Sequence, residues 1–230
     1  MATATPQPAP EHVPSLAEQY RELASAAYAP RRVDIALRAL DLIIAGTALV
    51  VLSPLLGLLA LATLITSGRP VLYRGQRVGR AGRVFTMYKL RTLRPGAEIR
   101  LGNLYGEELS RRTEEEVTRV GKAARLTHID EVPQLWNVIC GDMSIVGPRP
   151  VRPAFFNRLV EEVPQYWQRL VVRPGVTGFA QTRITREDSW EDKLIHDLEY
   201  IADRSIRLYL RVLGATIVRI IRLTFSGRNR

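Results

Sequence analysis

The longest apolar run of the chain extends from Leu42 to Ile65 and contains no charged residue. About 20 apolar residues suffice for a helix to span a bilayer, so this run predicts a membrane segment. Ser53-Pro54 lies at its middle, and a proline there removes one helical hydrogen bond and bends or breaks the helix. Each arm would have about 11 residues and a length of roughly 16 Å. That length is about half of a hydrocarbon core ~30 Å thick.

The charges on both sides of this run favour a re-entrant hairpin. Arginines precede it and follow it at the positions Arg31, Arg32, Arg38, Arg69, Arg74, Arg77, Arg80 and Arg83. A spanning helix is expected to have more positive charge at one end than at the other. We therefore expect residues 31–68 to form a helix–break–helix hairpin that enters and leaves by the same leaflet, broken at Ser53 and Pro54. The Ser53 hydroxyl is a candidate partner for the freed backbone groups. A spanning helix and a buried helix of a soluble domain remain alternatives.

Apart from this segment, the pattern predicts a mainly helical α+β protein with one small β-hairpin. Apolar runs in residues 70–93 are separated by glycines and predict two strands with a basic tip. Helical spacing of apolar residues predicts helices over residues 154–169 and 190–201. Pro-Gly and Thr-Gly predict a turn-rich loop over residues 172–179. The charged stretch 95–118 predicts a mobile loop with one short helix.

The N-terminus of the chain is expected to be disordered and the C-terminus to be helical. Residues 1–14 are rich in Ala, Thr and Pro, which is typical of a disordered tail. A Ser15–Glu18 capping box then predicts a short amphipathic helix. Residues 205–230 combine an apolar stripe with several arginines and no acid, which is typical of a helix in the interface of an anionic membrane. A partner-binding helix is the alternative. The predicted parts are an N-terminal tail with a short helix (1–30), the re-entrant membrane hairpin (31–68), a central domain (69–204) and a basic interfacial helix (205–230).

The composition narrows the classes of partner. The net charge is +10 and the pI about 10.3, so nucleic acid, an acidic membrane surface and phosphorylated substrates are the candidate partners. The single Cys140 excludes an intramolecular disulfide framework, and three scattered histidines give no zinc-type ligand cluster. Cys140 lies on an apolar run, so core packing is expected for it.

The acidic pair Asp130-Glu131 is the candidate catalytic feature. Pro133 fits only the first turn of a helix, so a short helix is expected to begin near the pair and to end at Gly141. The start of a helix can stabilise a carboxylate or a phosphate. Arg125 and Arg149 frame the pair in sequence, which makes a plausible site for a phosphoryl group and a metal ion. Ordinary surface acids that complement a helix dipole are the alternative.

Two further charged features are candidates for phosphate binding. Lys89 and Arg91 follow the second predicted strand at alternate positions and point the same way; contact with lipid headgroups is the alternative to phosphate binding. Asp197 lies late in its predicted helix, where an acid opposes the dipole. An ion pair with Lys193, four residues earlier, would explain Asp197 without any function.

Several motifs together resemble one family. They are Ser53-Pro54 in the apolar run, Tyr88-Lys89-Leu90-Arg91-Thr92, Thr118-Arg119-Val120-Gly121, Asp130-Glu131-Val132-Pro133-Gln134-Leu135-Trp136-Asn137-Val138, Gly141-Asp142-Met143-Ser144, Val146-Gly147-Pro148-Arg149-Pro150 and Arg173-Pro174-Gly175-Val176-Thr177-Gly178-Phe179-Ala180-Gln181. Over residues 31–224 the chain is similar to the monotopic bacterial phosphoglycosyl transferases, also called initiating sugar transferases, in their short form. The motifs occur in the order that the family has.

The resemblance implies transfer of a sugar-1-phosphate from a UDP-sugar to undecaprenyl phosphate, with release of UMP. The product starts an exopolysaccharide, O-antigen, capsule or glycoprotein glycan. The resemblance also implies the cytosolic face of the bacterial inner membrane, a catalytic domain over residues 69–204 and Mg²⁺ as cofactor. It implies no nucleic-acid partner and leaves a homodimer open.

The resemblance also implies roles for residues of this chain. Asp130 would be the nucleophile that forms an aspartyl phosphosugar, and Glu131 would help to hold Mg²⁺. The residues implied to bind nucleotide or phosphates are Lys89, Arg125 and Arg149, with Asp197 in the same site. Charge neutralisation and in-line positioning are what phosphoryl transfer needs most.

The chain departs from the family pattern at three places. His128-Ile129 replaces a Ser-Leu before the acidic pair, and Phe179 replaces a frequent Trp. Thr182-Arg183-Ile184 replaces an Asn-Gly-Arg where sugar selectivity can arise, so the sugar is not defined. A non-catalytic basic adaptor bound to the membrane is the competing class. A nucleic-acid binder is disfavoured, because the chain has no such motif and few aromatic platforms for bases.

Overall fold

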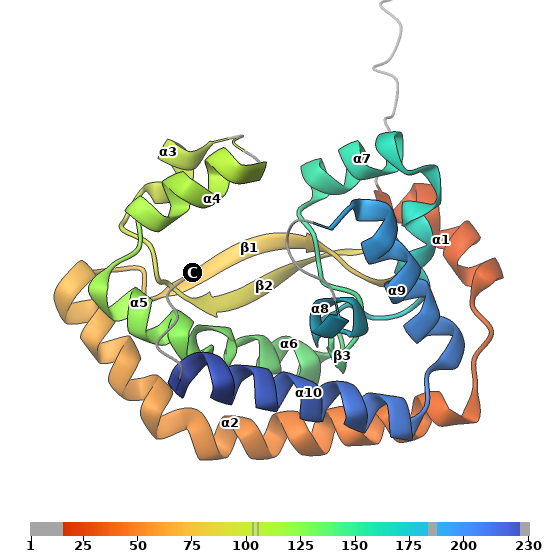
Figure 1. Ribbon diagram of the computed structural model, residues 1–230, viewed down its shortest axis with the longest axis horizontal. Coiled ribbons are helices and arrows are strands. Elements are labelled where there is room, and N and C mark those ends of the chain that lie inside the picture. Colours follow the sequence, from red (N-terminus) through yellow and green to blue (C-terminus); the bar gives the residue numbers. More distant parts are fainter. Residues whose placement is uncertain (1–15, 103, 105, 184–187, 226–230) are drawn as a thin grey trace, which may run out of the picture.

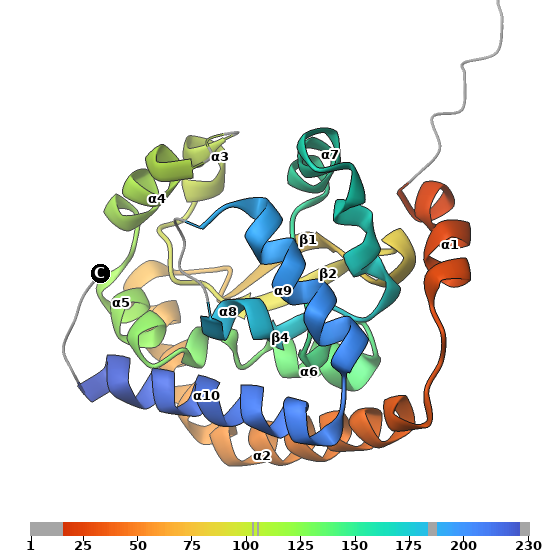
Figure 2. The same cartoon turned by 45° about the vertical axis from the view of Figure 1, so that its right-hand side comes forward.

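The computed structural model describes residues 16–102, 104, 106–183 and 188–225. Two long helices, α2 (Arg32–Ser67) and α10 (Ile206–Phe225), lie side by side along one face, and most other elements stack above them (Figures 1 and 2). The other α-helices are α1 (Leu16–Ala27), α3 (Ala97–Leu101), α4 (Gly106–Glu115), α5 (Arg119–Leu126), α6 (Gln134–Cys140), α7 (Pro153–Glu162), α8 (Phe179–Arg183) and α9 (Trp190–Asp203). The 3₁₀ helices are η1 (Arg80–Gly82), η2 (Ile129–Glu131) and η3 (Pro164–Val171), and the strands are β1 (Leu72–Val78), β2 (Val84–Leu90), β3 (Ser144–Val146) and β4 (Gly175–Thr177). The predicted class, mainly helical with a small β-hairpin, is confirmed.

The segment predicted as a broken hairpin is one helix. α2 continues through Pro54, so the predicted interruption at Ser53 and Pro54 is wrong. The helix instead changes direction part-way along its length (Figure 1). Pro54 has no N–H to offer to the carbonyl of Val50, four residues earlier, and the Ser53 hydroxyl donates to that carbonyl at 2.9 Å. Ser53 thus supplies the partner expected of it, and the helix continues past the proline.

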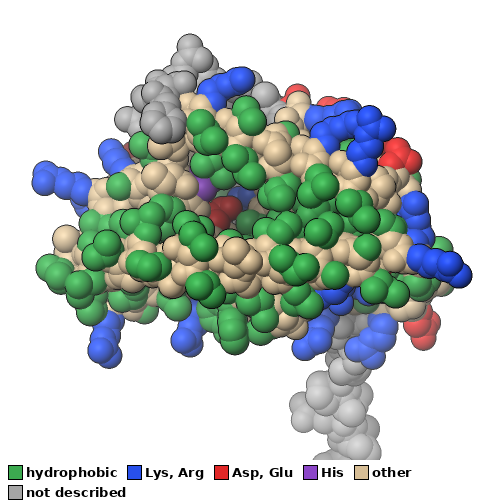
Figure 3. All heavy atoms as spheres, turned by 90° about the horizontal axis from the view of Figure 1, so that it is seen from below, with side chains coloured by type: hydrophobic (Ala, Val, Ile, Leu, Met, Phe, Trp, Pro, Cys, Tyr) green, Lys and Arg blue, Asp and Glu red, His purple; other side chains and the backbone are tan. Residues whose placement is uncertain are grey.

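The underside formed by α2 and α10 is apolar. Among the described residues, α2 is the one helix long and apolar enough to cross a membrane, and only 6% of its most apolar window is buried. This exposure contradicts the alternative of a buried helix in a soluble domain. The large apolar side chains exposed on the two helices are Ile35, Leu42, Ile43, Val50, Val51, Leu55, Leu58, Leu61, Leu64, Ile65, Ile206, Leu210, Ile217, Val218 and Ile221. Figure 3 shows them in bands across the underside, with Lys and Arg mainly near the rim. Apolar surface of this extent marks contact with a membrane or a partner.

Asp41, on α2, joins this underside to the rest of the molecule. It is 3% exposed, and its Oδ1 accepts hydrogen bonds from the Ser144 hydroxyl (2.9 Å), the Ile145 N–H (2.8 Å) and the Tyr209 hydroxyl (2.9 Å). A buried carboxylate with three donors is well satisfied. Because these donors belong to β3 and α10, one side chain ties both elements to α2.

The predicted β-hairpin is confirmed. β1 and β2 pair antiparallel from Leu72↔Leu90 to Val78↔Val84, and η1 forms the tip, which carries Arg80. α6 lies between this hairpin and α2. The buried Asn137 side chain fastens α6 to β2, since it donates to the Thr86 carbonyl (2.8 Å) and accepts from the Tyr88 N–H (3.1 Å). These two bonds fix the end of β2 relative to α6.

Three other predictions need correction. The turn-rich loop 172–179 contains β4, which pairs parallel with β3. The helix predicted over 154–169 is divided into α7 and η3, because Pro164 has no N–H with which to continue α7. The loop 95–118 contains two helices, α3 and α4, and not one.

Two smaller predictions have different outcomes. Cys140 is exposed, so its predicted core packing is wrong; Leu135 and Val138 form the buried face of α6 instead. The predicted tail and the Ser15 cap lie outside the described residues.

Candidate active site

The acidic pair lies in a tight turn between α5 and α6. His128 adopts the left-handed conformation (φ 56°, ψ 16°) and turns the chain from α5 into η2, which contains Asp130 and Glu131. Pro133 is the N-cap of α6, and Gly141 (φ 88°) ends the helix as predicted. The pair therefore precedes α6 and lies in a 3₁₀ turn of its own.

Lys89 contacts Glu131 directly. It lies near the end of β2, and its Nζ is 2.5 Å from Glu131 Oε1. The two side chains are 19% and 20% exposed, so a ligand can still reach them. Burial raises the pKa of Glu131, but the charges of Lys89 and then Arg149 outweigh that effect and lower its pKa to about 2. Glu131 is therefore ionised throughout the neutral range.

Asp130 has the opposite electrostatic balance. It is 8% exposed, and burial together with the negative Glu131 raises its pKa from 3.8 to about 6, against the opposing charges of Lys89 and Arg125. At neutral pH it is mostly a carboxylate that is poorly solvated. A desolvated anion of this kind is suited to nucleophilic attack.

The other two predicted cations also border the pair. Arg125, on α5, donates from Nε to Thr92 Oγ1 at 2.9 Å, and its charge opposes the rise in the pKa of Asp130. Arg149 has an exposed side chain, and its charge lowers the pKa of Glu131. The structure thus brings Lys89, Arg125 and Arg149 around Asp130 and Glu131. This arrangement places positive charge near both carboxylates.

Asp197 lies elsewhere. It is 4% exposed on α9, and its Oδ2 is 2.8 Å from Nη2 of Arg169, on η3. Burial raises the pKa of Asp197, against the opposing charge of Arg169. The ion pair that the structure shows for Asp197 is therefore with Arg169, and not with Lys193. The predicted contact of Asp197 with substrate phosphates stays a prediction.

Two residues near the site were missed by the sequence reasoning. Asn137 holds β2 against α6 and so positions Lys89, and Thr92 holds the Arg125 guanidinium. A buried asparagine on the apolar face of a helix was the available signal for Asn137, because a buried amide needs several partners. Thr92 gave no such signal, since its partner is distant in sequence.

The site opens toward the apolar underside. Figure 3 shows a hollow between the apolar bands in which acidic and histidine side chains are visible. α10 borders the end of α5 on this side, because Thr224 donates to the carbonyl of Leu126 (3.3 Å). Burial, and to a smaller extent the charge of Arg219 on α10, lower the pKa of His128. A ligand held in lipid can therefore approach from the same face that the exposed apolar side chains occupy.

The described residues contain no group of three or more His, Cys, Asp or Glu side chains that could hold a metal ion. Two adjacent carboxylates are present at Asp130 and Glu131. Mg²⁺ is commonly held by one or two carboxylates together with substrate phosphates. The donor set therefore fits an ion that arrives with a diphosphate, and does not fit an ion held by protein alone.

Comparison with known proteins identifies the family. Residues 32–223 match the family model described as bacterial sugar transferase. The chain belongs to the bacterial sugar transferase family. Asp130, Glu131, Lys89, Arg125 and Arg149 all lie within the matched residues of this bacterial sugar transferase.

Three curated relatives show how the family members are named. The UDP-N-acetylgalactosamine-undecaprenyl-phosphate N-acetylgalactosaminephosphotransferase of Aeromonas hydrophila is 36% identical over 194 residues, 83% of this chain and 44% of the relative. The UDP-glucose:undecaprenyl-phosphate glucose-1-phosphate transferase of Caulobacter vibrioides is 36% identical over 193 residues, 80% of this chain and 69% of the relative. The exopolysaccharide production protein PSS of Rhizobium leguminosarum bv. phaseoli is 35% identical over 189 residues, 79% of this chain and 92% of the relative. The chain therefore spans less than half of the Aeromonas relative.

Proposed function

We propose that this protein is a phosphoglycosyl transferase that moves a sugar-1-phosphate from a UDP-sugar to undecaprenyl phosphate and releases UMP. The observation that carries the proposal is the Asp130-Glu131 pair, framed by three cations on the side that opens toward an apolar underside. One substrate is soluble and the other is held in lipid, so the chemistry requires a site at the level of the headgroups. The lipid product would begin a surface glycan such as an exopolysaccharide.

In the first step, an Asp130 carboxylate oxygen attacks the β-phosphorus of the donor. An O–P bond to Asp130 forms while the bond from the β-phosphorus to the bridging oxygen breaks, and UMP leaves with that electron pair. The product is an aspartyl phosphosugar. The two negative charges of the diphosphate would repel Asp130, and Lys89, Arg125 and Arg149 offset this repulsion.

In the second step, a phosphate oxygen of undecaprenyl phosphate attacks the same phosphorus. The bond to Asp130 breaks, the carboxylate is restored, and a lipid-linked diphosphosugar is released. Charge balances in both steps without a proton transfer. No general acid or base is needed, so His128 receives no such role even though it lies beside the pair.

Glu131, with Asp130, is the candidate holder of Mg²⁺. The ion, when bound, would neutralise diphosphate charge and polarise the phosphoryl oxygens. Lys89 already contacts Glu131, so this lysine would keep the carboxylate oriented while the donor binds.

The membrane geometry is part of the proposal. We expect α2 to enter and leave the cytosolic leaflet of the inner membrane by the same side, and α10 to lie in the interface of that anionic leaflet. Arginines flank both ends of α2, and the helix changes direction part-way along its length (Figure 1); these two features support the proposal. Whether two copies associate is left to direct measurement of mass in detergent.

The topology is tested by cysteine labelling in intact cells. Cys140 is exposed, so it is first replaced by serine, and a single cysteine is then placed at Arg32 or at Arg69. Both sites are expected to stay protected from membrane-impermeant reagents added outside. Labelling at one end only would establish a spanning helix.

The reaction is tested in detergent with undecaprenyl phosphate, Mg²⁺ and a panel of donors that includes UDP-glucose and UDP-N-acetylgalactosamine. The wild-type protein is expected to release UMP from at least one donor, and Asp130→Asn to abolish the release. Release that Asp130→Asn leaves intact would contradict the mechanism. No release from any donor would favour the non-catalytic adaptor.

The Thr182-Arg183-Ile184 stretch is the candidate determinant of donor choice from sequence, and Ile184 lies outside the described residues. The donor panel answers this question directly, since the named relatives differ in the sugar that their names give.

A further inference from the structure

The backbone around Arg149 is held by distant groups. Prolines precede and follow Arg149, and a proline has no N–H with which to fix a loop. The Pro148 carbonyl accepts from the Gly175 N–H at 2.9 Å, and the Val151 carbonyl accepts from the Val78 N–H at 2.9 Å. Between them, the carbonyl of Arg149 accepts from a side chain, the Nη2 of Arg169, at 2.9 Å.

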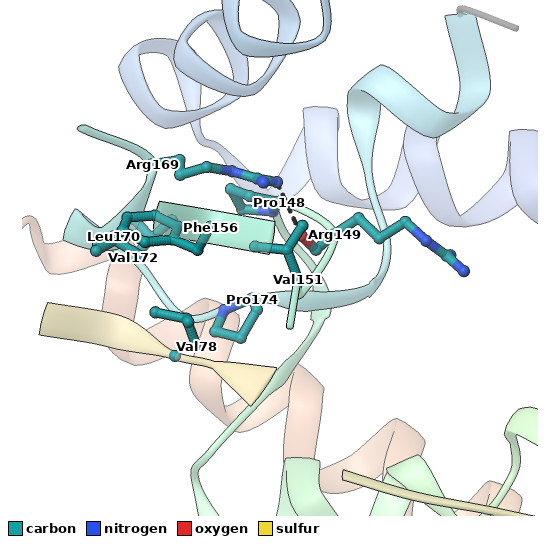
Figure 4. A pocket seen from close by; sticks show the side chains of 10 residues that line it. Val78, Pro148, Arg149, Val151, Phe156, Arg169, Leu170, Val172 and Pro174 are labelled. Atoms are coloured by element: carbon teal, nitrogen blue, oxygen red, sulfur yellow. Dashed lines mark hydrogen bonds between the residues drawn. The ribbon is translucent and has the colours of Figure 1, made fainter. Parts of the chain in front are cut away.

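Figure 4 shows the result of this arrangement. The Arg149 carbonyl faces Arg169, whereas the Arg149 side chain extends the opposite way. A peptide plane that is held at its carbonyl fixes the direction in which the neighbouring side chain leaves the backbone. The Arg169–Arg149 hydrogen bond therefore fixes the side on which the Arg149 guanidinium leaves the backbone. The charge of this guanidinium lowers the pKa of Glu131.

The Arg169 guanidinium is itself fixed by contacts with Asp197 and Tyr166. Its guanidinium pairs with Asp197 at 2.8 Å, donates from Nη1 to the Tyr166 hydroxyl and lies over the Tyr166 ring at 4.6 Å. The Arg169 and Asp197 side chains are 5% and 6% exposed. A planar fork of donors can serve a carboxylate and a carbonyl at the same time, which a lysine cannot reproduce.

We propose that Asp197 and Arg169 are positioning residues: Asp197 holds the Arg169 guanidinium, and Arg169 holds the Arg149 carbonyl so that the Arg149 side chain faces the donor diphosphate. This inference rests on the proposed function. Asp197 thus acts through Arg149 and touches no substrate.

The packing around the Arg169 guanidinium leaves little room for a ligand. The cavity beside Arg169 has a volume of about 10 Å³, which is about the room that one water needs. It is lined mainly by apolar side chains such as Val78, Phe156 and Leu170. A phosphate cannot enter without unpacking this part of the core.

A double-mutant cycle tests the proposal. The value of kcat/KM for the UDP-sugar, read as UMP release, is compared for wild type, Asp197→Asn, Arg149→Ala and the double variant. We expect Asp197→Asn to lose about tenfold, since loss of positioning by a fraction of an ångström to 1 Å has effects of this size or larger. We expect Arg149→Ala to lose about 100-fold. The double variant should match Arg149→Ala within about twofold, because Asp197 has nothing left to position.

A loss of about 1,000-fold in the double variant, the product of the single losses, would overturn the proposal. Asp34→Asn is the control, because it breaks another Arg–Asp pair, Arg204–Asp34 (2.7 Å), that does not touch the Arg149 backbone. If Asp34→Asn lowers kcat/KM, the combined loss in the Asp34→Asn and Arg149→Ala double variant should equal the product of the two single losses. If the losses of Asp197→Asn and Asp34→Asn both multiply with that of Arg149→Ala, Asp197 is merely structural and the proposal is wrong.

The proposed function and this inference can fail separately. If wild type releases no UMP from any donor, the proposed function fails. Calorimetric binding of UDP with Mg²⁺ then decides the inference. Asp197→Asn should weaken UDP binding when Arg149 is present and leave it unchanged in the Arg149→Ala background. Equal weakening in both backgrounds, or none in either, overturns the inference.

Discussion

Two cation–carboxylate pairs support the candidate site, and they differ in access to solvent. The side chains of Lys89 and Glu131 are about one-fifth exposed, whereas those of Arg169 and Asp197 are 5% and 6% exposed. Burial raises the pKa of both carboxylates, but cations overcome it only at Glu131, whose pKa is lowered; at Asp197 burial prevails. Two ion pairs of similar composition therefore differ in what they can contact. The Lys89–Glu131 pair (the open pair) is accessible to a substrate, whereas the Arg169–Asp197 pair (the sealed pair) contacts Tyr166 and the Arg149 carbonyl inside the protein.

The largest expected effect on stability comes from breaking the sealed pair. Asp197→Ala leaves the Arg169 cation buried without its carboxylate, and removal of one partner of a buried pair costs about 3–5 kcal/mol. Chemical denaturation in detergent measures the change in the free energy of unfolding. A loss below about 1 kcal/mol would show that Arg169 finds solvent or another anion.

The open pair is expected to affect catalysis more than stability. Lys89→Met should lower the rate of UMP release by about 100-fold, because one preorganised charge at the transferred phosphoryl group is lost. Its unfolding free energy should change by only about 1 kcal/mol, since Glu131 is reachable by water. Lys122→Met, at an exposed lysine, is the control and should match wild type. Equal losses of unfolding free energy in Lys89→Met and Asp197→Ala would contradict the difference proposed between the two pairs.

The charged form of Asp130 is expected to lower the free energy of unfolding. Its pKa is about 6 in the folded protein and 3.8 ordinarily. Ionisation of Asp130 therefore does not affect the free energy of unfolding below pH 3.8, and lowers it by the full amount above pH 6. Asp130→Asn should therefore raise the unfolding free energy by about 1–3 kcal/mol at pH 7.5 with EDTA present. The gain should shrink as the pH falls through 6 and vanish near pH 4. A gain that does not depend on pH would contradict the raised pKa.

The Arg158–Glu162 pair, the most exposed of the three compared, is expected to contribute least to stability. Arg158 and Glu162 lie one turn apart on α7 at 2.8 Å, with side chains 45% and 47% exposed. Glu162→Gln should change the unfolding free energy by no more than about 0.5 kcal/mol, because water and salt screen such pairs. A larger change would mean that side-chain exposure does not determine how strongly each of the three pairs affects the free energy of unfolding.

The sequence predicted those elements whose cause is local. The apolar run of α2, the β1–β2 hairpin, the end of α6 at Gly141 and the helix α10 all follow from spacing, glycines and charge near the residues concerned. Pro54 was expected to break the helix, which in fact continues past it, although the Ser53 hydroxyl that bonds the freed carbonyl was identified. Pro164 was overlooked, so η3 was merged with α7.

What the sequence did not predict depends on long-range contacts. β3 and β4 have three residues each and pair across a long connection, so neither has a pattern of its own. In the site, the acidic pair and its three cations were named from sequence and resemblance. The Asp197–Arg169 pair and the Asn137 clamp were not, because their partners are far apart in the chain.

The central claim is that Asp130 becomes esterified to a phosphosugar. Intact-protein mass spectrometry after incubation with the active UDP-sugar, without undecaprenyl phosphate, tests it most directly. The account predicts an added mass of one sugar phosphate, located at Asp130 by peptide mapping, absent in Asp130→Asn and removed by undecaprenyl phosphate. Steady UMP release on addition of undecaprenyl phosphate with no adduct at any stage, or an adduct on another residue, would contradict it.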